Sequence, residues 1–70
     1  MKIIVNAELQ EWEKSTISYD ELLQLTGKTG FQTIMVSYHR QDKKSRTLIQ
    51  GQEVDVLEGM VIDVHRTDNA

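Results

Sequence analysis

Few side chains in this chain are able to do chemistry, and their positions do not suit catalysis. Asp20 and Glu21 form a carboxylate pair of the kind used in acid–base catalysis, but the first turn of a helix explains them better. The two histidines, His39 and His65, fall short of the three or four converging ligands that a metal site needs. The absence of cysteine excludes a thiol nucleophile and thiolate ligands. We therefore expect no catalytic residue, no metal and no enzyme activity.

The second candidate is the segment that closes the sequence. It follows a predicted strand and consists of polar or small residues, Arg66, Thr67, Asp68, Asn69 and Ala70. A terminus without a function frays, whereas a tail held out from a folded body can be the working part of a protein. The sequence predicts a folded domain over residues 1–65 and a flexible tail over residues 66–70.

The charge distribution argues against nucleic-acid binding. The net charge is −3, but it is unevenly spread, because one short cluster consists of Arg40, Asp42, Lys43, Lys44 and Arg46. Four cations minus one carboxylate make this cluster +3, which leaves −6 for the remainder. Such a cluster around a turn is typical of a solvated loop; a contact to phosphate or to an acidic partner is the alternative. Because only Tyr38 adds an aromatic ring there, we expect no nucleic-acid partner.

Length and hydropathy point to one small domain away from membranes. The chain has 70 residues, and a domain of this size buries roughly 60% of the surface that its unfolded form exposes. No apolar run approaches the roughly 20 residues of a membrane span. The first residues lack the basic and then apolar pattern of a signal peptide. We expect a cytoplasmic protein without a membrane partner.

Alternating apolar residues predict five strands, over residues 2–9, 10–15, 31–40, 47–51 and 60–65. On the first of them Ile3, Val5 and Ala7 are expected to share one face. A hairpin is expected within residues 6–10, and a turn region at residues 54–60.

One short helix is predicted at residues 19–26. Ser18 and Glu21 have the spacing of a capping box, in which each side chain bonds the backbone amide at the other's position. Ile17 is placed to staple the entry of the helix, and Gly27 can adopt the left-handed conformation that ends it. A helix this short needs a sheet to lie on.

The order of these elements predicts an α+β fold. A right-handed crossover through the helix sets the first strand beside a later one, and the last strand can then run parallel to the first in the centre of the sheet. We expect a roll with a mixed four- to five-stranded sheet covered by one helix.

Three short segments and the closing strand carry a resemblance to a known family. The segments are IIVNAE near the start, ISYDELLQLTG across the predicted helix, and GQEVDVLEGM before the last strand. In this order they resemble the ubiquitin-like β-grasp fold, and more specifically the bacterial multiubiquitin-type family of ubiquitin-like domains. Together they span nearly the whole chain.

The resemblance implies a protein modifier that performs no chemistry of its own. Its C-terminal carboxylate would be adenylated by an activating enzyme at the expense of ATP, passed as an activated ester to a nucleophile, and finally joined to an amine of a target protein. The implied partners are this activating enzyme, a conjugating enzyme, a deubiquitinase-like peptidase and the target proteins. The modifier itself would need no cofactor.

The tail departs from the better-known modifiers and sulfur carriers of this fold, which end in Gly-Gly. Glycine lets a backbone pass close to enzyme walls, but this chain ends in TDNA. Three explanations are open. A peptidase trims Ala70 or more before activation, the activating enzyme accepts Asn69 and Ala70, or the domain is never conjugated and only docks. The departure disfavours a sulfur carrier.

A second surface is predicted on the face of the sheet that the helix leaves open. Ile4, Met35 and Val61 should cluster there, with His65 at the edge of the patch. Clustered exposed apolar groups suggest a partner-binding site, so the alternative function is a non-conjugated interaction module. Trp12 is expected at the sheet edge or over the end of the helix.

Overall fold

The structure, a computed structural model, describes residues 1–27, 34–42 and 44–66, with the backbone alone at residue 66. Within these ranges the chain forms one helix, α1 (Tyr19–Thr26), and a series of short strands. The strands are β1 (Lys2–Val5), β2 (Glu8–Glu11), β3 (Thr16–Ser18), β4 (Ile34–His39), β5 (Arg46–Leu48), β6 (Glu53–Asp55) and β7 (Val61–Arg66).

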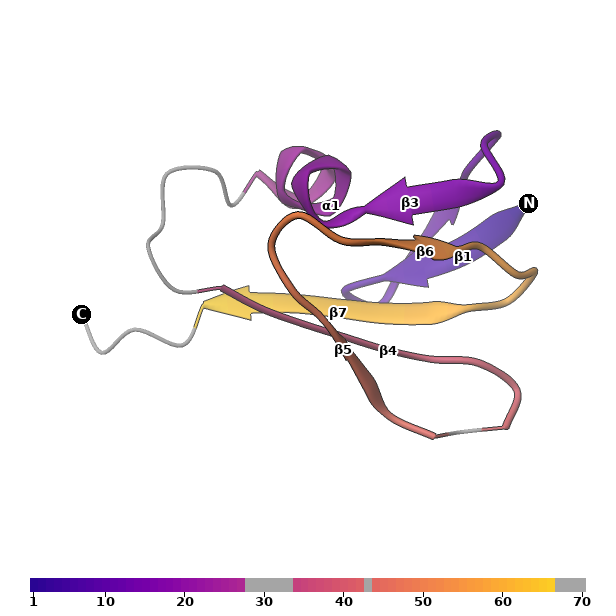
Figure 1. The fold of residues 1–70 in the computed structure, drawn as a ribbon. Coiled ribbons are helices and arrows are strands. Elements are labelled where there is room, and N and C mark those ends of the chain that lie inside the picture. Colours follow the sequence, from indigo (N-terminus) through magenta and orange to yellow (C-terminus); the bar gives the residue numbers. More distant parts are fainter. Residues whose placement is uncertain (28–33, 43, 67–70) are drawn as a thin grey trace.

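Five of the strands form a mixed sheet in the order β2-β1-β7-β4-β5. β7 runs parallel to β1 and antiparallel to β4, so the last strand occupies the middle of the sheet. Helix α1 and the small β3–β6 pair lie on one side of this sheet (Figure 1). The predicted α+β fold is confirmed, and the arrangement is consistent with a β-grasp.

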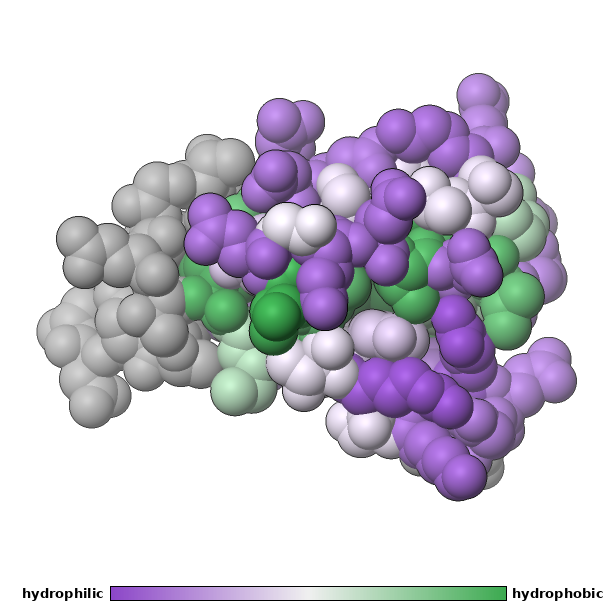
Figure 2. Space-filling view, in the orientation of Figure 1, coloured by the Kyte–Doolittle hydropathy of each residue, from purple (hydrophilic) through white to green (hydrophobic). Residues whose placement is uncertain are grey.

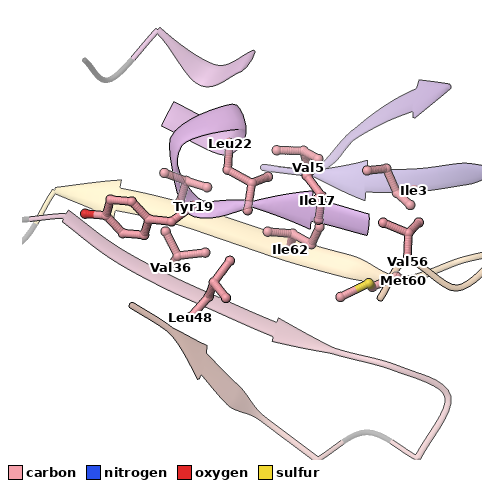
Figure 3. Packing of buried hydrophobic residues seen from close by; sticks show 11 residues of the cluster. Ile3, Val5, Ile17, Tyr19, Leu22, Val36, Leu48, Val56, Met60 and Ile62 are labelled. Atoms are coloured by element: carbon pink, nitrogen blue, oxygen red, sulfur yellow. The ribbon is translucent and has the colours of Figure 1, made fainter. Parts of the chain in front are cut away.

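The core lies between the sheet and the layer formed by α1 with the β3–β6 pair. Side chains from both layers point toward one another around Leu22 and Ile62 (Figure 3). The buried set is Ile3, Val5, Ile17, Tyr19, Leu22, Val36, Leu48, Val56, Met60, Ile62 and Val64. Since β7 contributes alternate residues to this set, only one of its faces is buried, as the period-two pattern predicts.

The helix has the predicted bounds and caps. The Glu21 backbone N–H donates to Ser18 Oγ at 3.1 Å, and the Ser18 N–H donates to Glu21 Oε1 at 3.0 Å. Gly27 takes φ +70°, and its N–H reaches the carbonyls of Gln24 and Leu23. An ion pair with Lys14 and the capping bonds lower the pKa of Glu21. The carboxylates of this turn are explained by helix formation.

The first predicted strand is wrong beyond Val5, because the chain turns at Asn6 and Ala7. Both residues have positive φ, +52° and +66°, as in the type I′ turns that join twisted strands. Ala7 is exposed instead of sharing the buried face of Ile3 and Val5. The turn lies within the predicted hairpin region, residues 6–10. The first strand was predicted too long because the alternation of apolar residues runs through the turn unbroken and no glycine marks it.

Other boundaries also differ from the predictions. The second strand, predicted at 10–15, is β2 at Glu8–Glu11. The prediction missed β3 and also β6, which overlaps the start of the predicted turn region, because three residues are too few to show a period of two. β7 includes Arg66, one residue beyond the predicted start of the tail, and its partner in β4 is Ile34. Residues 31–33 of the predicted third strand lie outside the described residues.

The turn generates a test of backbone strain. A non-glycine residue in the left-handed region costs about 1–2 kcal/mol, so Ala7→Gly relieves strain while adding some unfolded-state entropy. We expect a gain of up to about 1 kcal/mol in the free energy of unfolding, measured with urea. Gly59→Ala is the matched reverse change, since Gly59 has φ +78° and open space where a Cβ would lie. It should destabilise the protein by about 1 kcal/mol. A lower free energy of unfolding in Ala7→Gly than in the parent chain would contradict the strain assigned to the turn.

Candidate functional site

The face of the sheet opposite the helix carries a row of side chains that crosses four strands and is apolar on three of them. Strand register sets Leu9 of β2 beside Ile4 of β1, and Ile4 beside Val61 of β7. Val61 in turn lies opposite His39 of β4. Leu9 is 67% exposed, whereas Ile4 and Val61 are half-buried by their neighbours. This row consists of Leu9, Ile4, Val61 and His39. It brings together Ile4 and Val61, two of the four predicted patch residues.

The other two predicted patch residues meet at the far end of the same face. Met35 lies opposite His65, and the Met35 side chain is 47% exposed. Val61 and His65 are four residues apart along β7, which corresponds to about 13 Å. Asp63 with Ser37 lies between them. The predicted patch is therefore two pairs on one face, separated by a polar row, and not one continuous cluster.

Leu9 is the residue of this face that the sequence pattern missed. Reading residues 2–9 as one strand ran past the turn and left Leu9 out of the patch. The signal that could have found it was Asn6, since Asn is among the few residues that readily adopt positive φ in a two-residue turn.

Near the end of β7, a side chain makes the backbone hydrogen bonds that a neighbouring strand would otherwise make. β1 turns away after Val5, so it cannot continue its ladder along β7. The Asn6 side chain takes over: Val64 N–H donates to Asn6 Oδ1 at 2.7 Å, and Asn6 Nδ2 donates to the Val64 carbonyl at 3.0 Å. On the other side β4 pairs with β7 as far as Arg66. The backbone of β7 is therefore hydrogen-bonded on both sides near its end. Residues 67–70, the rest of the predicted tail, lie outside the described residues.

Part of the positive charge of the basic cluster between β4 and β5 is neutralised by an ion pair within the cluster. Arg46 Nη2 lies 2.7 Å from Asp42 Oδ2, and this contact, followed by the Lys44 N–H, lowers the pKa of Asp42 to about 2. Arg40 donates to the Asp55 carbonyl at 3.1 Å and lies over the Tyr38 ring. Hydrophilic side chains cover this loop, at the lower right of Figure 2. These contacts fit the predicted solvated loop; Lys43 lies outside the described residues.

The described residues contain no group of three or more His, Cys, Asp or Glu side chains placed to hold a metal ion. In the same ranges, no helix has the length and apolar character to cross a membrane.

The fold and its central last strand define a ubiquitin-like domain. A family model for multiubiquitin matches residues 1–68, nearly the whole chain, and the chain belongs to the multiubiquitin family. Searches among curated proteins and among solved structures returned no significant match.

The Asn6 contact predicts a measurable contribution to the stability of β7. Asn6→Gly keeps the positive φ but removes both hydrogen bonds, which leaves the Val64 backbone groups unpaired. We expect a loss of about 1–3 kcal/mol in urea unfolding and faster amide hydrogen exchange at Val64. Asn6→Asp is the control, because it retains the acceptor for the Val64 N–H. Equal stability and exchange in Asn6→Gly and the parent chain would refute this role.

Proposed function

We propose that this domain is a bacterial ubiquitin-like protein modifier, whose C-terminal carboxylate is activated by an ATP-dependent activating enzyme and conjugated to target proteins in the cytoplasm. Membership of the multiubiquitin family supports the ubiquitin-like part of this proposal. The conjugating enzyme and a deubiquitinase-like peptidase would be its further partners.

The observation that carries the proposal is the position of β7. A central strand bonded on both sides is among the most rigid parts of a sheet, and its last residue is Arg66. A segment leaving such a strand has a fixed point of departure from the folded body. Residues 67–70 add at most about 14 Å of reach when fully extended.

The chemistry asks little of the modifier beyond a free carboxylate. In the proposed sequence this carboxylate attacks the α-phosphorus of ATP, pyrophosphate leaves, and an acyl adenylate forms. A nucleophile of the enzymes then displaces AMP, and a target amine finally displaces that nucleophile to form an amide. In this proposal every catalytic group belongs to the partner enzymes. This is compatible with the sequence, in which we recognise no set of residues typical of a catalytic nucleophile and its base.

The tail of this chain lacks a terminal Gly-Gly, so the activating enzyme must bind a different C-terminal sequence. Either a peptidase exposes a new carboxylate upstream of Ala70, or the enzyme channel accepts the small Asn69 and Ala70 side chains. Both routes keep the folded body intact, because cleavage after Arg66 or beyond leaves the β4–β7 pairing complete.

The test is incubation with the ATP-dependent activating enzyme that this proposal requires. With ATP, we expect pyrophosphate release and a covalent adduct detected by mass spectrometry, for the full chain or for forms trimmed within residues 67–70. A chain ending at Arg66 should fold normally and lose adduct formation unless Arg66 itself is the processed end. If no form in this series gives an adenylate or an adduct, the proposal fails.

The open face favours a second function, a non-conjugated interaction module. Met35 and Leu9 expose apolar side chains on the face that also holds Ile4, Val61 and His65. Exposed apolar groups on one sheet face suit a protein partner.

Two surface variants separate docking from conjugation. We expect Met35→Asp to weaken partner binding at least tenfold, whereas Ser15→Asp, an exposed change just before β3 and away from the open face, serves as a control for added charge. Binding is measured by titration calorimetry against the partner protein under test. Docking should survive removal of residues 67–70, whereas conjugation should not. An unchanged affinity in Met35→Asp would exclude the Met35–His65 end of the face.

A further inference from the structure

The corner of the sheet where β4 turns into β5 carries a concentration of positive charge. Its described cations are Arg40, Lys44 and Arg46, and we call this set the basic corner. Asp42 is the only carboxylate between Arg40 and Arg46 in the sequence. Arg40 meets the nearby Asp55 through the backbone carbonyl of that residue, and no ion pair joins their side chains within the described ranges. Cations therefore outnumber carboxylates at this corner even when both aspartates are counted.

Asp42 shows which kind of group the basic corner binds. The Arg46 guanidinium donates two parallel hydrogen bonds to its carboxylate, from Nη1 to Oδ1 at 3.3 Å and from Nη2 to Oδ2 at 2.7 Å. The Lys44 backbone N–H donates a third to Oδ1 at 3.1 Å. A guanidinium fork of this kind matches the geometry of a carboxylate. These contacts, first of all the one with Arg46, lower the pKa of Asp42 to about 2, so the corner favours a carboxylate in its charged form.

Hydrogen-bond donors remain at the corner after Asp42 is bound. Arg40 donates from Nη2 to the Asp55 carbonyl at 3.1 Å, but its Nε has no hydrogen-bond partner among the described residues. The Arg40 guanidinium lies over the Tyr38 ring, 5.7 Å from the ring centroid, and this contact limits its movement. The Lys44 side chain is exposed. A ligand with several carboxylates therefore finds donors beyond those that Asp42 uses.

The same corner has an unpaired backbone edge, because β5 is the last strand of the sheet order and no described strand lies on its outer side. The Asn6 N–H donates to the Ile62 carbonyl, so the backbone groups of Ile62 point toward β1 and not toward β4. Tyr38, which lies opposite Ile62, therefore directs its own groups away from β7 and bonds Arg46 of β5. One residue further along β5, Thr47 directs its N–H and C=O groups outward.

We propose that the basic corner and the outer edge of β5 bind an extended acidic segment of a partner protein. Carboxylates of this segment contact Lys44, Arg40 and Arg46, and they compete with Asp42 for the Arg46 fork. The backbone of the segment exchanges hydrogen bonds with the outward N–H and C=O groups of Thr47. In the free domain, Asp42 occupies part of the site that the partner takes.

The chemistry of the edge favours a protein segment over the other occupants. The outward Thr47 carbonyl needs an N–H donor, which a polypeptide backbone supplies and a phosphate backbone lacks. The Tyr38 ring is covered by Arg40, so it is a poor platform for stacking a nucleic-acid base. A second copy of this chain also fits less well, because on its own edge strand β2 the exposed Glu11 already lies opposite Lys2.

The first experiment maps binding with a defined probe, a short blocked peptide that alternates glutamate and valine. In amide NMR spectra of the full chain, the N–H signal of Thr47 should shift most, and those of Arg46 and Leu48, which face β4, should shift less. Trp12 follows β2 at the other edge of the sheet, so its fluorescence should stay unchanged. Affinity should fall as salt is raised, because exposed charges are screened. A matched peptide with lysine in place of glutamate should not bind.

The second experiment tests the competition with Asp42. Asp42→Asn keeps an Oδ1 acceptor for the Lys44 N–H but removes the charge that holds the Arg46 fork, so affinity for the glutamate peptide should rise about twofold to threefold. Arg46→Gln should weaken binding about threefold. Lys2→Gln is the matched control, because it removes the same charge from β1 and should leave the affinity unchanged.

The third experiment removes the outward donor of β5. Thr47→Pro deletes an N–H that β4 does not use, and proline is tolerated on edge strands. We expect the peptide affinity to fall at least about threefold, with the signals of the core unchanged. Thr47→Val, which keeps the donor, should bind the peptide as the parent chain does.

Several outcomes would overturn the proposal. They are equal binding of the two peptides, weaker binding to Asp42→Asn, undiminished binding to a folded Thr47→Pro variant, and shifts that map to Leu9 and Met35 instead. Tighter binding of a single-stranded oligonucleotide than of the glutamate peptide would assign the corner to nucleic acid. Self-association through β5, seen by sedimentation and not displaced by the peptide, would assign it to a second copy. None of these readouts involves activation of the C-terminal carboxylate, so they are independent of the modifier function.

Discussion

The structure depends on the pairing of β7 along both of its sides. β1 bonds it in parallel near Val61 and Ile62, β4 bonds it through all six residues, and the Asn6 amide bonds it at Val64. The inner face of the same strand supplies Ile62 and Val64 to the core beneath α1 (Figure 3). Because the first and last strands are neighbours, the two ends of the sequence must come together before the core is complete. That requirement makes the last strand a structural centre and, at the same time, the support for whatever follows Arg66.

This arrangement leaves several distinct surfaces exposed on a very small domain. The buried face of the sheet is occupied by α1 and the β3–β6 pair, which leaves the opposite face, the edge at β5 and the end of β7 for partners. The open face is apolar at Leu9, Ile4 and Val61 and polar at its centre. β2 exposes Glu8 and Glu11, with Lys2 opposite Glu11, whereas the β4–β5 loop at the other end of the sheet order is basic and partly neutralised by Asp42. A protein of 70 residues can thus present different chemistry to different partners.

Local signals predicted the elements that local physics controls. The α1 bounds follow from Ser18, Glu21 and Gly27, whose contacts span only a few residues. The buried faces of β4 and β7 follow from strict alternation. The hairpin turn at Asn6 and Ala7 lies within its predicted region, but the bounds of the two flanking strands were wrong, because apolar alternation continued through the turn and an alanine with positive φ gives no sequence signal. β3 and β6 were missed because each exists only by pairing with the other, across more than thirty residues of chain.

The order of residues alone was enough to predict the class of fold, the single capped helix, the apolar faces of the longer strands and the lack of cysteine chemistry. Which of these faces meet depended on packing in three dimensions. Packing set Ile4 beside Val61 and Met35 beside His65 but kept the two pairs about 13 Å apart, and it carried β7 one residue into the predicted tail. It also recruited Asn6 to bond Val64, 58 positions away. Periodicity and capping act over a few residues, whereas register between strands is set by how distant segments pack and share hydrogen bonds.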